Sequence, residues 1–105
     1  MPERKETEDV RMPFHDDVAQ TIAIYKRVNR HPATRTNSMI ERHGMVEAIS
    51  RLMTTAELQQ GFRVLRDSGQ LHRTFEAVVM RHRHLFRPDV VGAAQWRLDH
   101  AHELF

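Results

Sequence analysis

Hydrophobic residues recur along most of this chain at spacings of three and four, which is the period of an amphipathic α-helix. The first such stripe consists of Val18, Ile22, Tyr25 and Val28. Asp16 or Asp17 is its expected N-cap, and the helix is predicted to end near Asn29. Pro32 disfavours helical geometry at His31, so a second element should begin after it.

Two glycines divide the next part of the chain into pairs of helical segments. Gly44 separates a segment at about 35–43 from another at about 45–53. Gly69 follows a fourth segment, which begins at a threonine cap and has its apolar side at Leu58, Phe62 and Leu65. A glycine just past an apolar helical run supplies the left-handed residue that ends a helix. Each glycine therefore predicts a helix–glycine–helix hairpin.

Two further helices complete the pattern. The fifth is expected to bury Leu71, Phe75, Val78, Val79 and His82, and to turn outward Arg73, Ala77, Met80, Arg81 and His84. Glu76 should point away from the core. Pro88 opens the last helix, whose predicted buried positions are Val91, Ala94, Leu98, Ala101 and Phe105. The fold class predicted is all-α, a compact bundle of five to six short helices built from the two hairpins.

Length and composition restrict the class of protein. A chain of 105 residues can bury one core, so residues 14–105 are predicted to be a single all-helical domain, preceded by a flexible charged arm at 1–13. Cysteine is absent, which excludes disulfides and thiolate zinc sites and suits a reducing cytoplasm. No apolar run is long enough for a membrane span or a secretory signal. A cytoplasmic protein without a membrane partner is expected.

Charge is distributed unevenly. The first 17 residues hold six acids against three basic residues, whereas twelve Lys and Arg residues face five acids between Lys26 and Arg87. The second hairpin and the segment after it carry Arg63, Arg66, Arg73, Arg81, Arg83, His84 and Arg87. Guanidinium groups bind phosphates and carboxylates with paired hydrogen bonds. These residues predict an anionic partner, first of all nucleic acid, bound through its phosphates, or a nucleic-acid-handling complex. An acidic protein surface is the other anionic partner that they suit.

Trp96 supports an alternative function. The predicted buried side of the last helix leaves Trp96 on the outside, where Met80 should also project. An outward tryptophan is a common interface anchor. The alternative is therefore an adaptor or inhibitor, of the kind that a mobile element encodes, which docks a protein or a second copy of the chain as a homodimer. A rotated last helix would instead make Trp96 a core contact.

Enzymatic and metal sites are not predicted. His82 and His84 are two residues apart, as are His100 and His102, and on a helix this spacing points the rings away from each other. His82 is expected in the core with a backbone partner. No serine-nucleophile elbow, phosphate-binding glycine loop or carboxylate within an apolar stripe is found. The expectation is a non-catalytic domain with no metal and no cofactor.

Several motifs are similar to those of a group of small bacterial proteins of uncharacterised function. The shared segments are His31-Pro-Ala-Thr-Arg35, His43-Gly-Met-Val-Glu-Ala48, Gly61-Phe-Arg-Val-Leu65, Gly69-Gln-Leu71 and Thr74-Phe-Glu-Ala-Val-Val-Met80. The resemblance spans most of residues 25–105 and implies an all-helical fold. The group tends to have an acidic, aromatic turn where this chain has the basic stretch Arg66–Arg73. The resemblance therefore implies a different partner for this chain at that turn.

Overall fold

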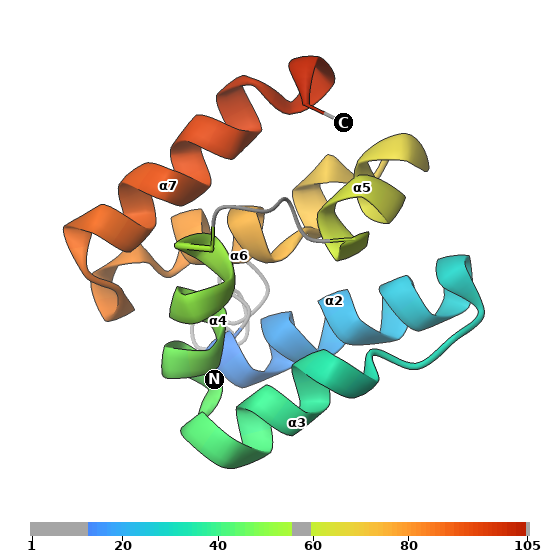
Figure 1. Cartoon of the computed structure of the whole chain (residues 1–105), viewed down its shortest axis with the longest axis horizontal. Helices are drawn as coiled ribbons and strands as arrows, with labels where there is room; N and C mark the ends of the chain where they lie inside the picture. Colours follow the sequence, from blue (N-terminus) through green and yellow to red (C-terminus); the bar gives the residue numbers. More distant parts are fainter. Residues whose placement is uncertain (1–12, 56–59, 105) are drawn as a thin grey trace, which may run out of the picture.

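The computed structural model describes residues 13–55 and 60–104, and this part of the chain forms six α-helices and three 3-10 turns without a strand (Figure 1). The elements are α2 (Phe14–Asn29), α3 (Thr34–His43), α4 (Met45–Met53), α5 (Gln60–Asp67), η1 (Leu71–Arg73), α6 (Phe75–Arg81), η2 (Arg83–Leu85), α7 (Pro88–Asp99) and η3 (Ala101–Glu103). The predicted all-α class is confirmed. The charged arm, apart from Pro13, and the predictions for Leu58 and Phe105 lie outside the described residues.

The N-cap of the first helix is Pro13, three residues before Asp16 and four before Asp17, the two predicted caps. Pro13 precedes α2, and its carbonyl accepts the amide of Asp17 at 2.9 Å. Asp17 therefore stands inside the first turn, where it is buried, while Asp16 is exposed. The helix ends as predicted at Asn29, followed by Arg30 in the left-handed conformation with φ 65°.

Both predicted glycine turns have positive φ, at 85° for Gly44 and 77° for Gly69. Gly44 ends α3 by donating its amide to the carbonyl of Ile40 at 2.8 Å, and α4 then packs back against α3. Beyond Gly69 the expectation of one continuous fifth helix is wrong. The turn η1 comes first, and α6 begins only after Thr74, whose hydroxyl accepts the amide of Ala77 at 3.2 Å. This cap sets the start of α6.

Helix α6 crosses the middle of the molecule, between α7 and α2 (Figure 1). The core around it is formed by Val18, Ile49, Leu52, Met53, Val78, Val79, Phe86, Val90 and Ala94. Two predicted burial patterns are corrected. Ala77 is buried rather than outward, and α7 buries Val90, Ala94 and Arg97 rather than Val91 and Leu98. The last helix is thus rotated by about one residue from the predicted orientation.

Candidate functional site

Asp17 is the centre of a buried ionic cluster. Its Oδ1 accepts hydrogen bonds from Nη2 of Arg73 at 3.1 Å and Nη2 of Arg81 at 2.9 Å. Its Oδ2 accepts from Nε of Arg81 and lies 2.9 Å from Nε2 of His82. Arg73 Nε is the buried side-chain polar atom that lacks a partner among the described residues. The cluster ties α2 to η1 and α6.

The charges around Asp17 also determine its ionisation. Burial alone would raise the pKa of Asp17, but the hydrogen bonds from Arg81, His82 and Arg73 outweigh burial and hold that pKa below its ordinary value. His82 is buried, as predicted, but its partner is this carboxylate rather than a backbone group. Arg73 and Arg81, two of the predicted anion-binding residues, therefore already bind an anion inside the protein.

The other five predicted anion-binding residues lie in different environments. Arg66 donates through Nη1 to the carbonyls of Ala101 at 3.0 Å and of Leu104, which fastens the C-terminal turn to α5. Arg87 forms an exposed pair with Asp89 at 3.1 Å. Exposed side chains without a hydrogen bond or ion pair among the described residues remain at Arg63, Arg83 and His84.

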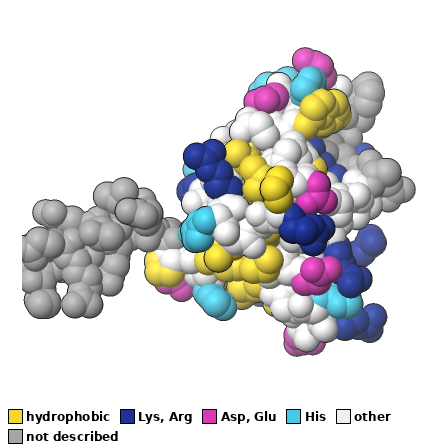
Figure 2. Space-filling view, turned by 90° about the vertical axis from the view of Figure 1, so that its left-hand side faces the viewer, with side chains coloured by type: hydrophobic (Ala, Val, Ile, Leu, Met, Phe, Trp, Pro, Cys, Tyr) yellow, Lys and Arg dark blue, Asp and Glu magenta, His cyan; other side chains and the backbone are white. Residues whose placement is uncertain are grey.

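These exposed residues do not form one surface. Arg63 belongs to α5, on the right of Figure 1, whereas Arg83 and His84 belong to the turn just before α7, on its left. The space-filling view shows the side that carries the start of α7, where hydrophobic side chains alternate with basic and acidic ones (Figure 2). A continuous arginine surface over the second hairpin is thus not what the fold provides.

A shallow, mainly apolar groove lies on the outer side of α7. Its lining residues come from α6, from η2 and its flanks, and from α7: Met80, Arg83, Phe86, Pro88, Val91, Gly92 and Gln95. Met80 is only half-buried, so the predicted outward projection holds in part. A Cβ added at Gly92 would meet no atom within 4 Å, so the helix surface is open at this residue.

Trp96 stands one turn beyond Gly92 and is 52% exposed, so its outward position is confirmed. Its ring stacks on the ring of His100 with centroids 4.2 Å apart, and Nδ1 of His100 lies 2.8 Å from the carbonyl of Trp96. The stack holds the indole in one orientation. An exposed tryptophan that is already ordered loses little conformational entropy when a partner covers it.

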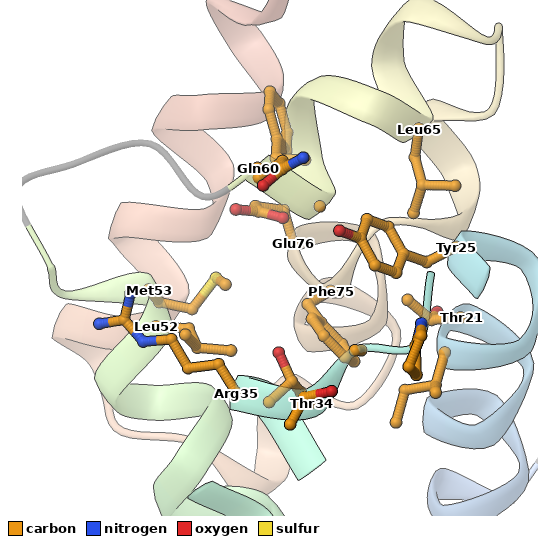
Figure 3. A pocket seen from close by; sticks show the side chains of 16 residues that line it. Thr21, Tyr25, Thr34, Arg35, Leu52, Met53, Gln60, Leu65, Phe75 and Glu76 are labelled. Carbon is orange, nitrogen blue, oxygen red and sulfur yellow. The ribbon is translucent and has the colours of Figure 1, made fainter. Parts of the chain in front are cut away.

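The second concave site is a cavity of about 300 Å³ on the opposite side of α6 from α7 (Figure 3). It is lined by residues of α2, α4, α5 and α6, by the start of α3 and by the chain that leads into it: Thr21, Ile22, Tyr25, Pro32, Ala33, Thr34, Arg35, Thr36, Leu52, Met53, Gln60, Gly61, Phe62, Leu65, Phe75 and Glu76. Seven of these 16 residues carry polar side-chain groups: Thr21, Tyr25, Thr34, Arg35, Thr36, Gln60 and Glu76. Small-molecule sites combine apolar walls with polar groups of this kind.

Glu76 is the acidic residue in the lining of this cavity. It is 2% exposed, and its Oε2 accepts a hydrogen bond from Nη1 of Arg97 at 3.0 Å. Arg97 also donates to the carbonyls of Leu52 at 3.1 Å and Thr55 at 2.7 Å. Burial raises the pKa of Glu76 above its ordinary value, although the Arg97 hydrogen bond opposes the effect. The expectations that Glu76 points off the core and that no carboxylate is buried are both wrong.

Sequence reasoning missed this pair for an identifiable reason. Glu76 lies within the apolar run from Phe75 to Val79, but the direction predicted for it on one continuous fifth helix is off the core, whereas α6 begins only at Phe75. Arg97 falls on the same helical stripe as Val90, Ala94 and Ala101 once the last helix is rotated by one residue. Two opposite charges on two apolar stripes are the signal that could have identified the pair.

No group of three or more histidine or acidic side chains is placed to hold a metal within residues 13–55 and 60–104. In the same ranges, no helix has the length and apolar character needed to cross a membrane. Comparison of the chain with protein-family models, curated proteins and solved structures gives no match. The resemblance to small bacterial proteins therefore stays a prediction, and the site's own geometry must support any function.

Proposed function

We propose that this protein is a non-catalytic, cofactor-free binding domain of the cytoplasm, which docks a partner protein on the outer face of α7. The observation that carries the proposal is the groove lined by Met80 and Arg83, whose lining also includes Gly92, one helical turn before the exposed Trp96. These residues come from two different sequence predictions, an apolar anchor and a cationic contact. Together they suit a protein segment that offers an apolar side chain beside a carboxylate.

The internal bonds of the arginines favour a protein over nucleic acid as the anionic partner. Binding of a phosphate backbone draws its affinity from many free cationic side chains. Arg66, Arg73 and Arg81 donate to acceptors within the chain. A protein segment needs only one cationic contact beside its apolar anchor, and Arg83 in the groove provides it.

Trp96→Ala tests the proposal in a capture experiment with the native host's lysate, with and without nuclease. We expect Trp96→Ala and Arg83→Glu each to weaken capture of one specific protein, with a loss of about 2 kcal/mol or more for the tryptophan, as at interface hot spots. The matched control is Val28→Ala, another exposed hydrophobic residue, on α2. Nuclease treatment should leave capture unchanged.

Three results would contradict this proposal. Capture that survives Trp96→Ala would show that α7 is not the docking face. Loss of the captured species after nuclease would favour nucleic acid as the partner instead. Concentration-dependent dimerisation of the purified chain that Trp96→Ala abolishes would assign the face to a second copy of this protein.

A further inference from the structure

A second binding site lies apart from the outer face of α7, in the cavity of about 300 Å³ shown in Figure 3. Pockets that hold small organic ligands begin at about this size. The side chains that line it come from five parts of the chain, so the cavity is formed only when the helices have packed. This origin distinguishes the cavity from a surface dimple between two neighbouring side chains.

Three aromatic side chains line the cavity. Tyr25 comes from α2, Phe62 from α5 and Phe75 from α6, and Figure 3 shows Tyr25 and Phe75 projecting into the space. The rest of the apolar wall comes from Ile22, Pro32, Ala33, Leu52, Met53 and Leu65. The face of an aromatic ring carries negative electrostatic potential and attracts cations. The walls therefore suit an apolar body that carries a positive charge.

The carboxylate of Glu76 gives the cavity its polar end. In Figure 3 the side chains of Glu76, Gln60 and Tyr25 lie at the same end of the space. The hydroxyl of Tyr25 accepts a hydrogen bond from Nδ2 of Asn29 at 3.0 Å. A carboxylate offers about four lone-pair positions, and Arg97 occupies one of them on Oε2. Accepting capacity therefore remains where the side chain borders the cavity.

We propose that this cavity binds a small organic ammonium compound, with the ammonium group donating to Glu76 and its apolar body between Tyr25, Phe62 and Phe75. The charged and titratable residues of the lining are Tyr25, Arg35 and Glu76. Arg35 is exposed and extends along α4, beside Leu52 and Met53, so water screens its charge. Glu76 is buried and pairs with Arg97 at 3.0 Å, but of these two partners only Glu76 lines the cavity. Its carboxylate is therefore the buried charged group that a ligand meets, in a setting of low dielectric.

Burial supports the same choice of ligand. Desolvation raises the pKa of Glu76, which means that the protein alone solvates this carboxylate incompletely. An ammonium group in the cavity would supply the missing stabilisation of the charged form. A carboxylate ligand would instead place a second negative charge next to a buried one and should be rejected.

Three compounds that share a phenylethyl group separate these possibilities by titration calorimetry at neutral pH: phenethylammonium, phenethyl alcohol and hydrocinnamate. We expect phenethylammonium to bind about tenfold more tightly than the alcohol, because each charged hydrogen bond adds about 1.4 kcal/mol or more. Hydrocinnamate should bind most weakly. Absence of binding by all three at millimolar concentration, equal affinities, or tightest binding of hydrocinnamate would each overturn the proposal.

Arg35→Gln provides a variant that leaves the core intact. Removing this rim cation should raise the affinity for phenethylammonium about twofold, since an exposed charge contributes up to about 1 kcal/mol. Arg42→Gln is the matched control, because Arg42 is an exposed arginine of the same helix that does not line the cavity. Equal effects of the two variants, or a fall in affinity with Arg35→Gln, would count against the site.

Glu76→Gln and Tyr25→Leu test the proposed contacts themselves. Glu76→Gln should abolish the preference for phenethylammonium over the alcohol, and Tyr25→Leu should reduce it even if the first variant fails to fold. A preference that survives in both variants would overturn the proposal. Trp96→Ala should leave phenethylammonium binding unchanged, so failure of this site can be told apart from failure of docking on α7.

Discussion

Two buried carboxylates of this protein lie in contrasting surroundings. Asp17 is 1% exposed and accepts hydrogen bonds from two guanidinium groups while it contacts the ring of His82. Glu76 is 2% exposed and has one cationic partner, Arg97, which closes only one side of it. The other side of Glu76 borders a cavity. The two acids are equally hidden from bulk solvent but differ in how fully they are bonded.

That difference separates a structural role from a binding role. The fully bonded carboxylate of Asp17 has little capacity for a ligand, and it fastens α2 to η1 and α6. The partly bonded carboxylate of Glu76 also joins two helices, α6 and α7, yet it keeps accepting capacity toward open space. Their pKa values move in opposite directions for this reason, downward for Asp17 and upward for Glu76. Burial alone therefore does not identify a functional carboxylate.

The largest effect is expected from Asp17→Asn. This change leaves Arg73 and Arg81 without their anion, and breaking a buried ion pair from one side costs about 3–5 kcal/mol. Chemical denaturation of the variant measures the loss in the free energy of unfolding. Asp16→Asn, at the exposed neighbouring position, should change stability by less than about 0.5 kcal/mol. A loss below about 1 kcal/mol for Asp17→Asn would show that the cluster does not hold the helices together.

Glu76→Gln should lower the free energy of unfolding by less than Asp17→Asn does. The expected loss is about 1.5–3 kcal/mol, which is the range for a hydrogen bond to a charged group. The amide oxygen of glutamine can still accept from Arg97. The double variant Glu76→Leu with Arg97→Met should be more stable than either of its single variants, because replacing both buried charges removes two desolvation costs. Equal costs for Asp17→Asn and Glu76→Gln would erase the contrast between the two acids.

The free energy of unfolding should also depend on pH in opposite ways for the two acids, with changes smaller than those expected from the substitutions. The folded chain holds the pKa of Asp17 below its ordinary 3.8, so this contribution to stability is present above that pH and is lost as the pH falls through the folded pKa. The folded chain holds the pKa of Glu76 above its ordinary 4.5, so stability should fall as the pH rises from that value to the folded pKa.

Denaturation midpoints measured as a function of pH can assign each change in stability to one carboxyl group. Asp17→Asn should remove the loss of stability at low pH, and Glu76→Gln should remove the loss of stability above the ordinary glutamate pKa. Each tenfold difference in proton affinity between folded and unfolded chains corresponds to about 1.4 kcal/mol. Identical pH profiles for the wild type and both variants would contradict the proposed environments.

The sequence predicted the helices better than it predicted the sites. Periodicity, Gly44 and Pro88 placed most helix ends within one or two residues, because these signals act locally. The bonds of Arg73 and Arg81 to Asp17 join residues 56 and 64 positions apart, which no local pattern reveals. These arginines were therefore assigned to a partner, Glu76 was predicted to point away from the core, and no role was predicted for Arg97.

Trp96 is a contrasting case, because its exposure was predicted although the orientation of its helix was not fully correct. A rotation of one residue moved the buried side from Val91 and Leu98 to Val90 and Arg97, and Trp96 stayed on the outer face in both. Exposure is predicted correctly despite such an error for a residue on the side of the helix away from the buried stripe. The groove beside Trp96 involves α6 and η2 as well, and it depends on tertiary packing that helical periodicity alone does not specify.

The most direct test of the contrast between the two acids is a carbon NMR titration that follows the side-chain carboxyls of Asp17 and Glu76, with and without phenethylammonium. We predict a pKa below 3.8 for Asp17 that the ligand leaves unchanged, and a pKa above 4.5 for Glu76 that the ligand lowers. Titration of both carboxyls below their ordinary values, or a ligand-induced change at Asp17 rather than Glu76, would contradict the account.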